Sequence, residues 1–153
     1  MIKFAKPDDI PQIVTFCYKT YKGLEDLELP EPSFDKITLQ VAEWVLNDVV
    51  LVYKDQEDSK EIQGVLMAEK GGFWWTDDDK YLQTSLFYVN PENPKRGRIA
   101  FELVEHLKDF ANDLGFSVLL DIIDKKENLE TVKKFISIKG YTPFSVSGLY
   151  RNQ

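Results

Sequence analysis

The chain has 153 residues, 43% of them hydrophobic and 13% aromatic, which is enough apolar material for one packed domain spanning residues 1–153. Its formal net charge of −7 argues against nucleic acid or an anionic membrane as the main partner, because both need a dominant basic surface. No apolar run approaches the roughly 20 residues that cross a bilayer, and the N-terminus lacks a long apolar signal region, so we expect a soluble, cytoplasmic protein.

In the first half, alternating and 3.6-period apolar patterns predict a strand, two helices and an antiparallel hairpin with a polar turn. An acidic, proline-bearing segment at Leu24–Pro32 separates the two helices. The predicted elements are the strand Ile2–Ala5, a helix that begins around Pro7 and ends at Gly23, a helix from near Ser33 or Asp35 to Asn47, and the strands Val49–Tyr53 and Ile62–Ala68.

In the second half, β-branched and aromatic runs alternate with amphipathic segments, which predicts strands alternating with helices. The run Ser117–Ile123 is almost wholly apolar, which is typical of a strand buried on both faces of a sheet. The predicted elements are the strand Tyr81–Val89, a helix Ile99–Leu114 that Gly115 ends, the strand Ser117–Ile123, a helix from about Asn128 to Lys139, and a last strand Ser145–Arg151.

The single cysteine and the single histidine exclude several kinds of chemistry. Cys17 cannot form an internal disulfide or a multi-cysteine zinc site, and its place on the apolar face of a predicted helix favours burial. His106 has no second histidine with which to bind a metal, and a serine–histidine triad has no support. We therefore expect no metal site.

A basic segment, Lys95-Arg96-Gly97-Arg98, joins the strand that ends at Val89 to the helix that follows. The first backbone N–H groups of a helix have no partner within it and carry a partial positive charge, so this junction suits a phosphate group. A basic helix start with one glycine is also common where no ligand binds. The segment alone leaves both interpretations open.

The run Val89-x-Pro91, the short loop, the basic Arg-Gly segment and the amphipathic helix resemble the acetyl-CoA signature of the GNAT N-acyltransferase superfamily. The resemblance covers essentially the whole chain and implies an α/β (α+β) fold, a mixed central sheet with splayed central strands and the order β-α-α-β-β-β-α-β-α-β. It implies acetyl-CoA as co-substrate, with the strand along the pantetheine arm and the loop amides on the pyrophosphate. The implied cofactor-binding residues are Phe87, Tyr88, Val89, Lys95, Arg96, Gly97, Arg98, Ile99, Ala100 and Asn128.

The basic segment departs from the family's usual pattern, which is Arg or Gln, two residues, Gly, one residue, then Gly or Ala. If the helix faces are aligned, Lys95 takes the first position, Arg98 the first glycine and Ala100 the last position. Alternatively, Arg96-Gly97 matches the family's Arg-Gly pair and the loop is one residue shorter. In either alignment an additional arginine could contact a phosphate through its side chain.

The catalytic residues stay unknown at this stage. The resemblance puts Gln83 where some family members have a carboxylate base, and an amide cannot serve as that base. Glu69 or the Asp77–Asp79 loop could receive the proton through water, although adjacent aspartates are also common in solvated loops. Ile136 stands where family members often have a tyrosine acid.

The resemblance implies transfer of an acetyl group to a primary amine of a small molecule or peptide. Acidic residues near the implied acceptor entrance would attract a cation, and Trp74 and Trp75 could either face an ammonium group or pack under their loop. Two alternatives stay open: a catalytically weak acyl-CoA-binding or interaction module on the same fold, and an α/β protein that binds another phosphate ligand. A homodimer is also left open. The acidic residues are Glu25, Asp26, Glu28, Glu31 and Asp77–Asp79.

Overall fold

The computed structural model describes residues 1–24, 29–124 and 126–143. The chain divides into two compact units, of which the first is Met1–Ile123 and the second begins at Asp124. The prediction of one domain over the whole chain therefore stays a prediction. The acidic residues Glu25, Asp26 and Glu28 and the predicted strand Ser145–Arg151 lie outside the described residues.

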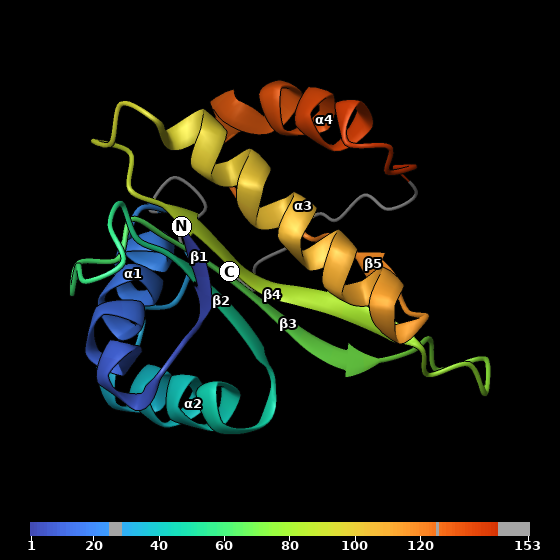
Figure 1. Ribbon diagram of the computed structural model, residues 1–153, viewed down its shortest axis with the longest axis horizontal. Helices are drawn as coiled ribbons and strands as arrows, with labels where there is room; N and C mark the ends of the chain where they lie inside the picture. The colour runs from blue at the N-terminus through green and yellow to red at the C-terminus, as the bar shows by residue number, and fades with distance from the viewer. Residues whose placement is uncertain (25–28, 125, 144–153) are drawn as a thin grey trace, which may run out of the picture. The chain divides into compact units, whose positions relative to one another are not determined.

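A five-stranded sheet in the order β1-β2-β3-β4-β5 forms the centre of the first unit (Figure 1). Strands β1 to β4 pair antiparallel, and β5 joins β4 in parallel, so the sheet is mixed as expected. The third strand begins and ends later than the predicted strand Ile62–Ala68. The strands are β1 Ile2–Phe4, β2 Val49–Tyr53, β3 Gly64–Gly71, β4 Tyr81–Val89 and β5 Ser117–Leu119.

The helices follow the predicted order, with one change at the start of α3. The serine hydroxyl of Ser33 accepts a hydrogen bond from the Lys36 N–H and caps α2, and Gly115 ends α3 with a left-handed φ of 71°. The basic residues that were expected to form a loop before Ile99 are already helical and form the first turn of α3. The helices are the 3₁₀ turn η1 Pro7–Asp9, α1 Ile10–Lys22, α2 Phe34–Asn47 and α3 Arg96–Leu114 in the first unit, and η3 Lys126–Asn128 and α4 Leu129–Ile138 in the second.

Helices cover both faces of the sheet, with α1 and α2 on one side and α3 on the other (Figure 1). Alternate residues of the strands pack in a core with α1 and α2, including Val52, Met67 and Leu86. On the opposite face, a Cβ atom added to Gly64 would lie 2.9 Å from Cγ2 of Ile99 and 3.0 Å from Cδ1 of Leu103. A glycine is therefore required where α3 crosses β3.

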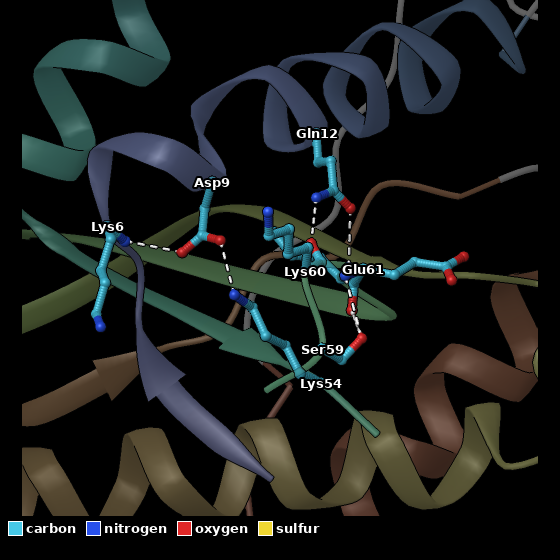
Figure 2. A network of polar contacts seen from close by, with 8 residues as sticks. Lys6, Asp9, Gln12, Lys54, Ser59, Lys60 and Glu61 are labelled. Atoms are coloured by element: carbon cyan, nitrogen blue, oxygen red, sulfur yellow. Dashed lines mark hydrogen bonds and ion pairs between the residues drawn. The ribbon is translucent and has the colours of Figure 1, made fainter. Parts of the chain in front are cut away.

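A polar network ties the start of α1 to the sheet (Figure 2). The carboxylate of Asp9, which is 5% exposed, accepts hydrogen bonds from the Lys6 N–H and the Lys54 ammonium, both at 2.9 Å. The side-chain amide of Gln12 donates to the carbonyl of Lys60. Because a buried carboxylate is costly unless it is paired, these contacts fix where α1 begins.

Candidate functional site

Strands β4 and β5 separate after a short paired stretch. The hydroxyl of Thr84 accepts a hydrogen bond from the Asp121 N–H at 2.8 Å and donates one to the Asp121 carbonyl at 3.1 Å, so a side chain replaces the next pair of ladder bonds. β4 continues to Val89, and from Ser85 onward its outer edge faces no strand among the described residues. The predicted splay of the central strands is confirmed. The parallel pairs are Tyr81 with Ser117, Leu82 with Val118, and Gln83 with Leu119.

The prediction that Ser117–Ile123 forms one strand buried on both faces is wrong. β5 ends at Leu119, Ser117 is exposed, and Val118 and Leu119 are only half-buried. The physical reason is that β5 loses its neighbour at Thr84, where a side chain takes over the hydrogen bonds. The apolar composition of the segment indicates that its side chains favour burial, but it does not indicate that a partner strand lies on each side.

A β-bulge in β4 lies at the same place. Met67 is opposite Leu86 and Ala68 is opposite Thr84, so Ser85 has no partner on β3. A bulge bends its strand and increases the local twist. The bend therefore coincides with the point where β4 and β5 part.

The segment Phe87–Val89, expected to lie along a pantetheine arm, is the part of β4 beyond this point. The N–H of Asn90 donates to the Gln63 carbonyl at 2.8 Å. Residues of an antiparallel strand face their partner alternately, so the backbone N–H and C=O of Val89 are directed to the opposite, open edge of β4. An extended ligand could therefore bond to this edge as an added strand would.

The side chain of Tyr88 lies on the face of the sheet that α1 covers. Its ring stacks on that of Phe16, with ring centroids 4.6 Å apart and an interplanar angle of 24°. Burial, followed by the charge of Glu92, raises the pKa of the Tyr88 phenol. By the same alternation the N–H and C=O of Tyr88 face β3, so neither its side chain nor its backbone is directed to a ligand on the open edge, and its predicted contact with a cofactor has little support.

A buried polar hub fixes the loop between β4 and α3. Gln63 and Asn93 are only 7% and 8% exposed, and the Gln63 Oε1 accepts from the side-chain amides of Asn90 at 3.1 Å and Asn93 at 3.0 Å. The Asn93 Oδ1 then accepts from the Lys95 N–H at 2.9 Å, and its carbonyl from the Arg96 N–H at 3.0 Å. Sequence reasoning missed this hub; two asparagines, each next to a proline, just before a helix were the available signal.

The N-terminus of α3 presents two backbone amides. The Ile99 N–H donates to the Lys95 carbonyl at 3.0 Å, whereas no described residue accepts a hydrogen bond from the N–H of Gly97 or Arg98. A Cβ atom on Gly97 would meet nothing within 4 Å, so the chain leaves open space at this turn. The amides and the dipole of a helix of 19 residues together suit an anion.

The two arginines expected at a phosphate already have contacts within the chain. The Arg98 Nε donates to the Glu102 Oε1 at 2.6 Å, and this hydrogen bond, followed by the carboxylate charge, raises the pKa of Arg98. The Arg96 Nη1 donates to the Pro91 carbonyl at 3.4 Å. Both arginine side chains are exposed, and so is that of Lys95, so all three can turn toward an anion. An arginine that does so can keep its present contact within the chain or exchange it for the anion.

Two further predicted residues differ in what they can offer a ligand. The side chain of Ile99 is fully buried against Gly64, and its amide is bonded to Lys95, so Ile99 contributes by packing α3 onto the sheet. Ala100, one position later, is half-buried. A direct contact to a cofactor therefore stays a prediction for Ala100 and has little support for Ile99.

Polar groups gather on β3, β4 and α2 where β5 departs. Glu69 lies opposite Gln83 in the β3–β4 register, and its Oε1 accepts from the Trp44 Nε1 at 2.6 Å. The Gln83 Nε2 donates to the Asp121 Oδ2 at 3.1 Å. Burial, then the negative charges of Glu69 and Glu43, raise the pKa of Asp48 at the end of α2. Carboxylates therefore flank Gln83 on both sides.

Sequence reasoning missed Trp44 and Asp121 as members of this group. The signal for Asp121 was a charged residue inside an otherwise apolar run. Trp44 carried no such signal, because its partner is 25 residues away in the chain.

Asn128 belongs to the second unit, where it stands at the N-cap position of α4. Its side chain makes no cap hydrogen bond; the Nδ2 donates to the Asp124 Oδ1 at 3.0 Å. An asparagine at this position could also serve only to cap the helix through its side chain, but that hydrogen bond is not formed, and contact with a cofactor stays a prediction. Ile136 lies within α4, the same helix.

Other chemistry finds little support in the described part of the chain. No group of three or more His, Cys, Asp or Glu side chains there is placed to hold a metal ion. Cys17 is buried, and burial raises the pKa of its thiol to about 12, so it stays protonated. Within the same residues, every helix is too short or too polar to cross a membrane.

No model of a known protein family matches this chain, and no curated protein matches its sequence. Solved structures do match its fold. A possible acetyltransferase from Clostridium difficile 630 is similar at 19% identity with a TM-score of 0.70, covering 100% of this chain and 97% of that one. The aminoglycoside N-acetyltransferase AAC(6')-Iy in complex with CoA is similar at 14% identity and a TM-score of 0.71, over 100% and 94% of the two chains.

A GNAT family acetyltransferase from Staphylococcus aureus is similar at 16% identity and a TM-score of 0.60, over 100% of this chain and 98% of that one. At these identities the likeness concerns the fold alone. The chain has the fold of the GNAT acetyltransferases, as its sequence led us to expect.

Proposed function

We propose that this protein is an acetyl-CoA-dependent N-acetyltransferase that acts on a primary amine of a small molecule or peptide. The observation that carries the proposal is the separation of β4 from β5 after Gln83, with the N-terminus of α3 following the far end of β4. The backbone N–H and C=O of Val89 at the open edge of β4 would bond the pantetheine arm, and the amides of Gly97 and Arg98 would bond the pyrophosphate. Similar folds solved with CoA or a CoA-containing analogue support this assignment.

The chemistry needs a polarised thioester carbonyl and a route for one proton. The ammonium group first loses one proton. The neutral nitrogen then forms a bond to the carbonyl carbon, the carbon–sulfur bond breaks, the nitrogen loses a second proton to water and the thiolate gains one from water, so one proton is released overall. Backbone N–H groups on the open edge of β4, such as that of Val89, can stabilise the developing oxyanion. No particular side chain is required for this step.

The amine must be deprotonated before it attacks, because an alkyl ammonium has a pKa near about 10.4. Gln83 cannot accept this proton, but Glu69 lies directly opposite it and is oriented by the Trp44 indole. We assign Glu69 as the group that accepts the proton through a water molecule. Asp121, on the other side of Gln83, offers a second route.

A cationic acceptor fits the charge of this region. Glu69, Asp121 and the partly buried Asp48 lie around the strand separation, and together they favour an ammonium group over an anion. Aminoglycoside acetyltransferases among the similar folds support a small-molecule amine. The cytoplasmic location and the absence of nucleic-acid and membrane partners are further parts of the proposal, and a homodimer stays open.

The runner-up is an acyl-CoA-binding module with weak or no catalysis. It is favoured by one observation: the side chain of Gln83 is committed to Asp121 at the position where similar proteins can have a carboxylate. In this alternative the strand separation and the α3 amides bind CoA in the same way. The two functions therefore share a site and differ only in turnover.

The decisive experiment measures CoA binding and CoA release separately. Calorimetry would give the affinity for acetyl-CoA, and a thiol reagent would follow CoA release with a panel of amines; the buried Cys17 should not react with it. Turnover with any amine supports the enzyme, and binding without turnover supports the module. No binding of CoA, or equal competition by simpler nucleotides, would reject both in favour of another phosphate ligand.

A further inference from the structure

The loop between β3 and β4 exposes a pair of indole rings. Trp74 is 92% exposed and Trp75 is 63% exposed. The two rings meet edge to face, with centroids 5.8 Å apart and an interplanar angle of 89°. Phe73 stacks on Trp75 at 4.5 Å and contacts Tyr81, the first residue of β4, at 5.2 Å. The four rings of Phe73, Trp74, Trp75 and Tyr81 therefore form a cluster at the start of β4, the aromatic corner.

The loop has a fixed shape that keeps the indoles outside. A Cβ atom on Gly72 would lie 2.1 Å from the Asp78 carbonyl oxygen and 3.0 Å from the Asp79 Cα, so the two ends of the loop touch and only glycine fits. The Thr76 N–H donates to the Phe73 carbonyl at 3.2 Å, and the Thr76 hydroxyl accepts from the Asp78 N–H at 3.2 Å. The exposure of the indoles is thus part of a closed turn.

Carboxylates stand next to the aromatic corner. Asp77, Asp78 and Asp79 follow Trp75 after one intervening residue, and of the three only the Asp78 side chain accepts a hydrogen bond from a described residue, the Lys80 N–H at 3.0 Å. No cation of the described residues pairs with Asp77 or Asp79. The Lys70 ammonium, which also flanks the loop, lies over the Phe116 ring at 5.3 Å. Aromatic faces beside carboxylates attract organic cations.

Exposed aromatic surface of this kind marks a contact with a partner. A second copy of the chain is a poor occupant, because a two-fold contact would bring two Asp77–Asp79 segments together. A small cation fits the charge and the aromatic faces. Gln83, the last residue paired with β5, lies two positions beyond Tyr81, which is about 7 Å along the strand. A molecule on the loop can therefore also reach the place where β4 and β5 part.

We propose that the loop Phe73–Asp79 binds a second ammonium group of the amine acceptor, with Trp74 and Trp75 against its cationic end and Asp77 and Asp79 as counter-charges. The preferred acceptor is then a small molecule with at least two ammonium groups, one acetylated and one held by the loop. This rests on the acetyl transfer proposed above, of which it names the substrate class.

The test compares two acceptors that differ in one group, 1,8-diaminooctane and 8-amino-1-octanol. The wild-type protein should show a KM for the diamine about two- to fivefold below that for the amino alcohol, the size expected of one exposed cation–aromatic contact. Trp74→Ala should bring the ratio near one while kcat for the amino alcohol is kept, and the pair Asp77→Asn with Asp79→Asn should separately bring the ratio near one. Matched controls remove an exposed leucine or a carboxylate elsewhere: Leu39→Ala, which is 75% exposed, and Asp58→Asn.

A binding measurement separates this inference from the proposed function. Without acetyl-CoA, 1,8-diaminooctane should shift the fluorescence of the wild type and not that of Trp74→Ala, and the affinity for CoA should be the same in both. Equal KM values for the two acceptors, a ratio insensitive to the loop variants, or preference for a lysine peptide would each overturn the loop assignment. If no amine releases CoA, the proposed function fails, and the fluorescence titration alone decides whether the loop binds a diammonium compound.

Discussion

Replacing Gly64 with alanine should destabilise the protein, because α3 passes over β3 at this glycine. The new Cβ would lie 2.9 Å from the Ile99 Cγ2 and 3.0 Å from the Leu103 Cδ1, inside the about 3.5 to 4.0 Å of a favourable carbon contact. Ile99 is fully buried and branched at Cβ, so it cannot rotate away. Overpacking of this kind costs about 1 to 3 kcal/mol. For a domain of this size the loss corresponds to about 2 to 12 °C in Tm.

The same substitution should weaken CoA binding, although residue 64 is not among the residues proposed to contact CoA. Relief of the overlap moves the first turn of α3, which carries the amides of Gly97 and Arg98, relative to the edge of β4 that ends at Val89. Loss of alignment for one hydrogen bond to a charged group costs about 1.5 to 3 kcal/mol, which is a tenfold or larger rise in Kd.

Thermal unfolding and calorimetry with CoA measure the two effects. Gly71→Ala is the matched control, because it lies at the other end of the same strand and its Cβ would meet nothing within 4 Å. The double variant Gly64→Ala with Ile99→Ala should be less destabilised than the sum of the single variants, since truncation of Ile99 removes one overlap. A Tm for Gly64→Ala within about 1 °C of the wild type would refute the reasoning.

Three further predictions follow from the site. Gly97→Ala should leave the helix as stable or more stable by up to about 1 kcal/mol, since its Cβ has open space, yet weaken CoA binding; Gly97→Val should weaken it further, and unchanged affinity by calorimetry would exclude this turn as the pyrophosphate site. The value of kcat/KM should rise with pH as the fraction of free amine grows. Glu69→Gln should lower kcat/KM by less than about a hundredfold, because Asp121 offers a second route for the proton through water. A kcat/KM that stops rising by about pH 7, together with a larger loss in Glu69→Gln, would reveal a dedicated base. Cys17 should resist thiol reagents in the folded protein at about pH 8, and rapid labelling of the folded protein would contradict this. Because burial raises the pKa of the Cys17 thiol from 9.0 to about 12 in the folded state, its contribution to the free energy of unfolding should be retained below pH 9 and lost as the pH rises toward 12.

The order of the described elements could be predicted because each has its own periodicity and ends at a recognisable residue, such as Gly115 after α3. The start of α3 could not, because Arg96, Gly97 and Arg98 form an exposed first turn and the apolar pattern begins only at Ile99. A periodicity argument detects only the buried side of a helix. The expected loop was therefore a helical turn.

The site was harder to predict than the fold, because its fixed groups depend on long-range contacts. Gln63 and Asn93 meet across 30 residues of sequence, and Trp44 reaches Glu69 across 25. Nothing in the local sequence marks these as pairs. For the cations at the start of α3, the charge could be predicted from the sequence but the contact could not. Arg98 reaches Glu102 because both lie in the same helix, and the sequence pattern predicted that this helix begins only at Ile99.

The side chain of Thr84 contributes to the separation of β4 from β5, in addition to the path of the backbone. Backbone groups that lose their partner when a strand leaves a sheet need another one, and the hydroxyl of the buried Thr84 supplies it for both the N–H and the carbonyl of Asp121. Thr84→Val keeps the shape and removes both bonds, which should cost about 1 to 3 kcal/mol and either let β5 pair further along β4 or release Asp121. Hydrogen exchange at the Asp121 amide should accelerate or shift and the affinity for CoA should fall, whereas Thr84→Ser should preserve both. If Thr84→Val kept the slow exchange and the wild-type affinity, the hydroxyl would not be what holds the strands apart.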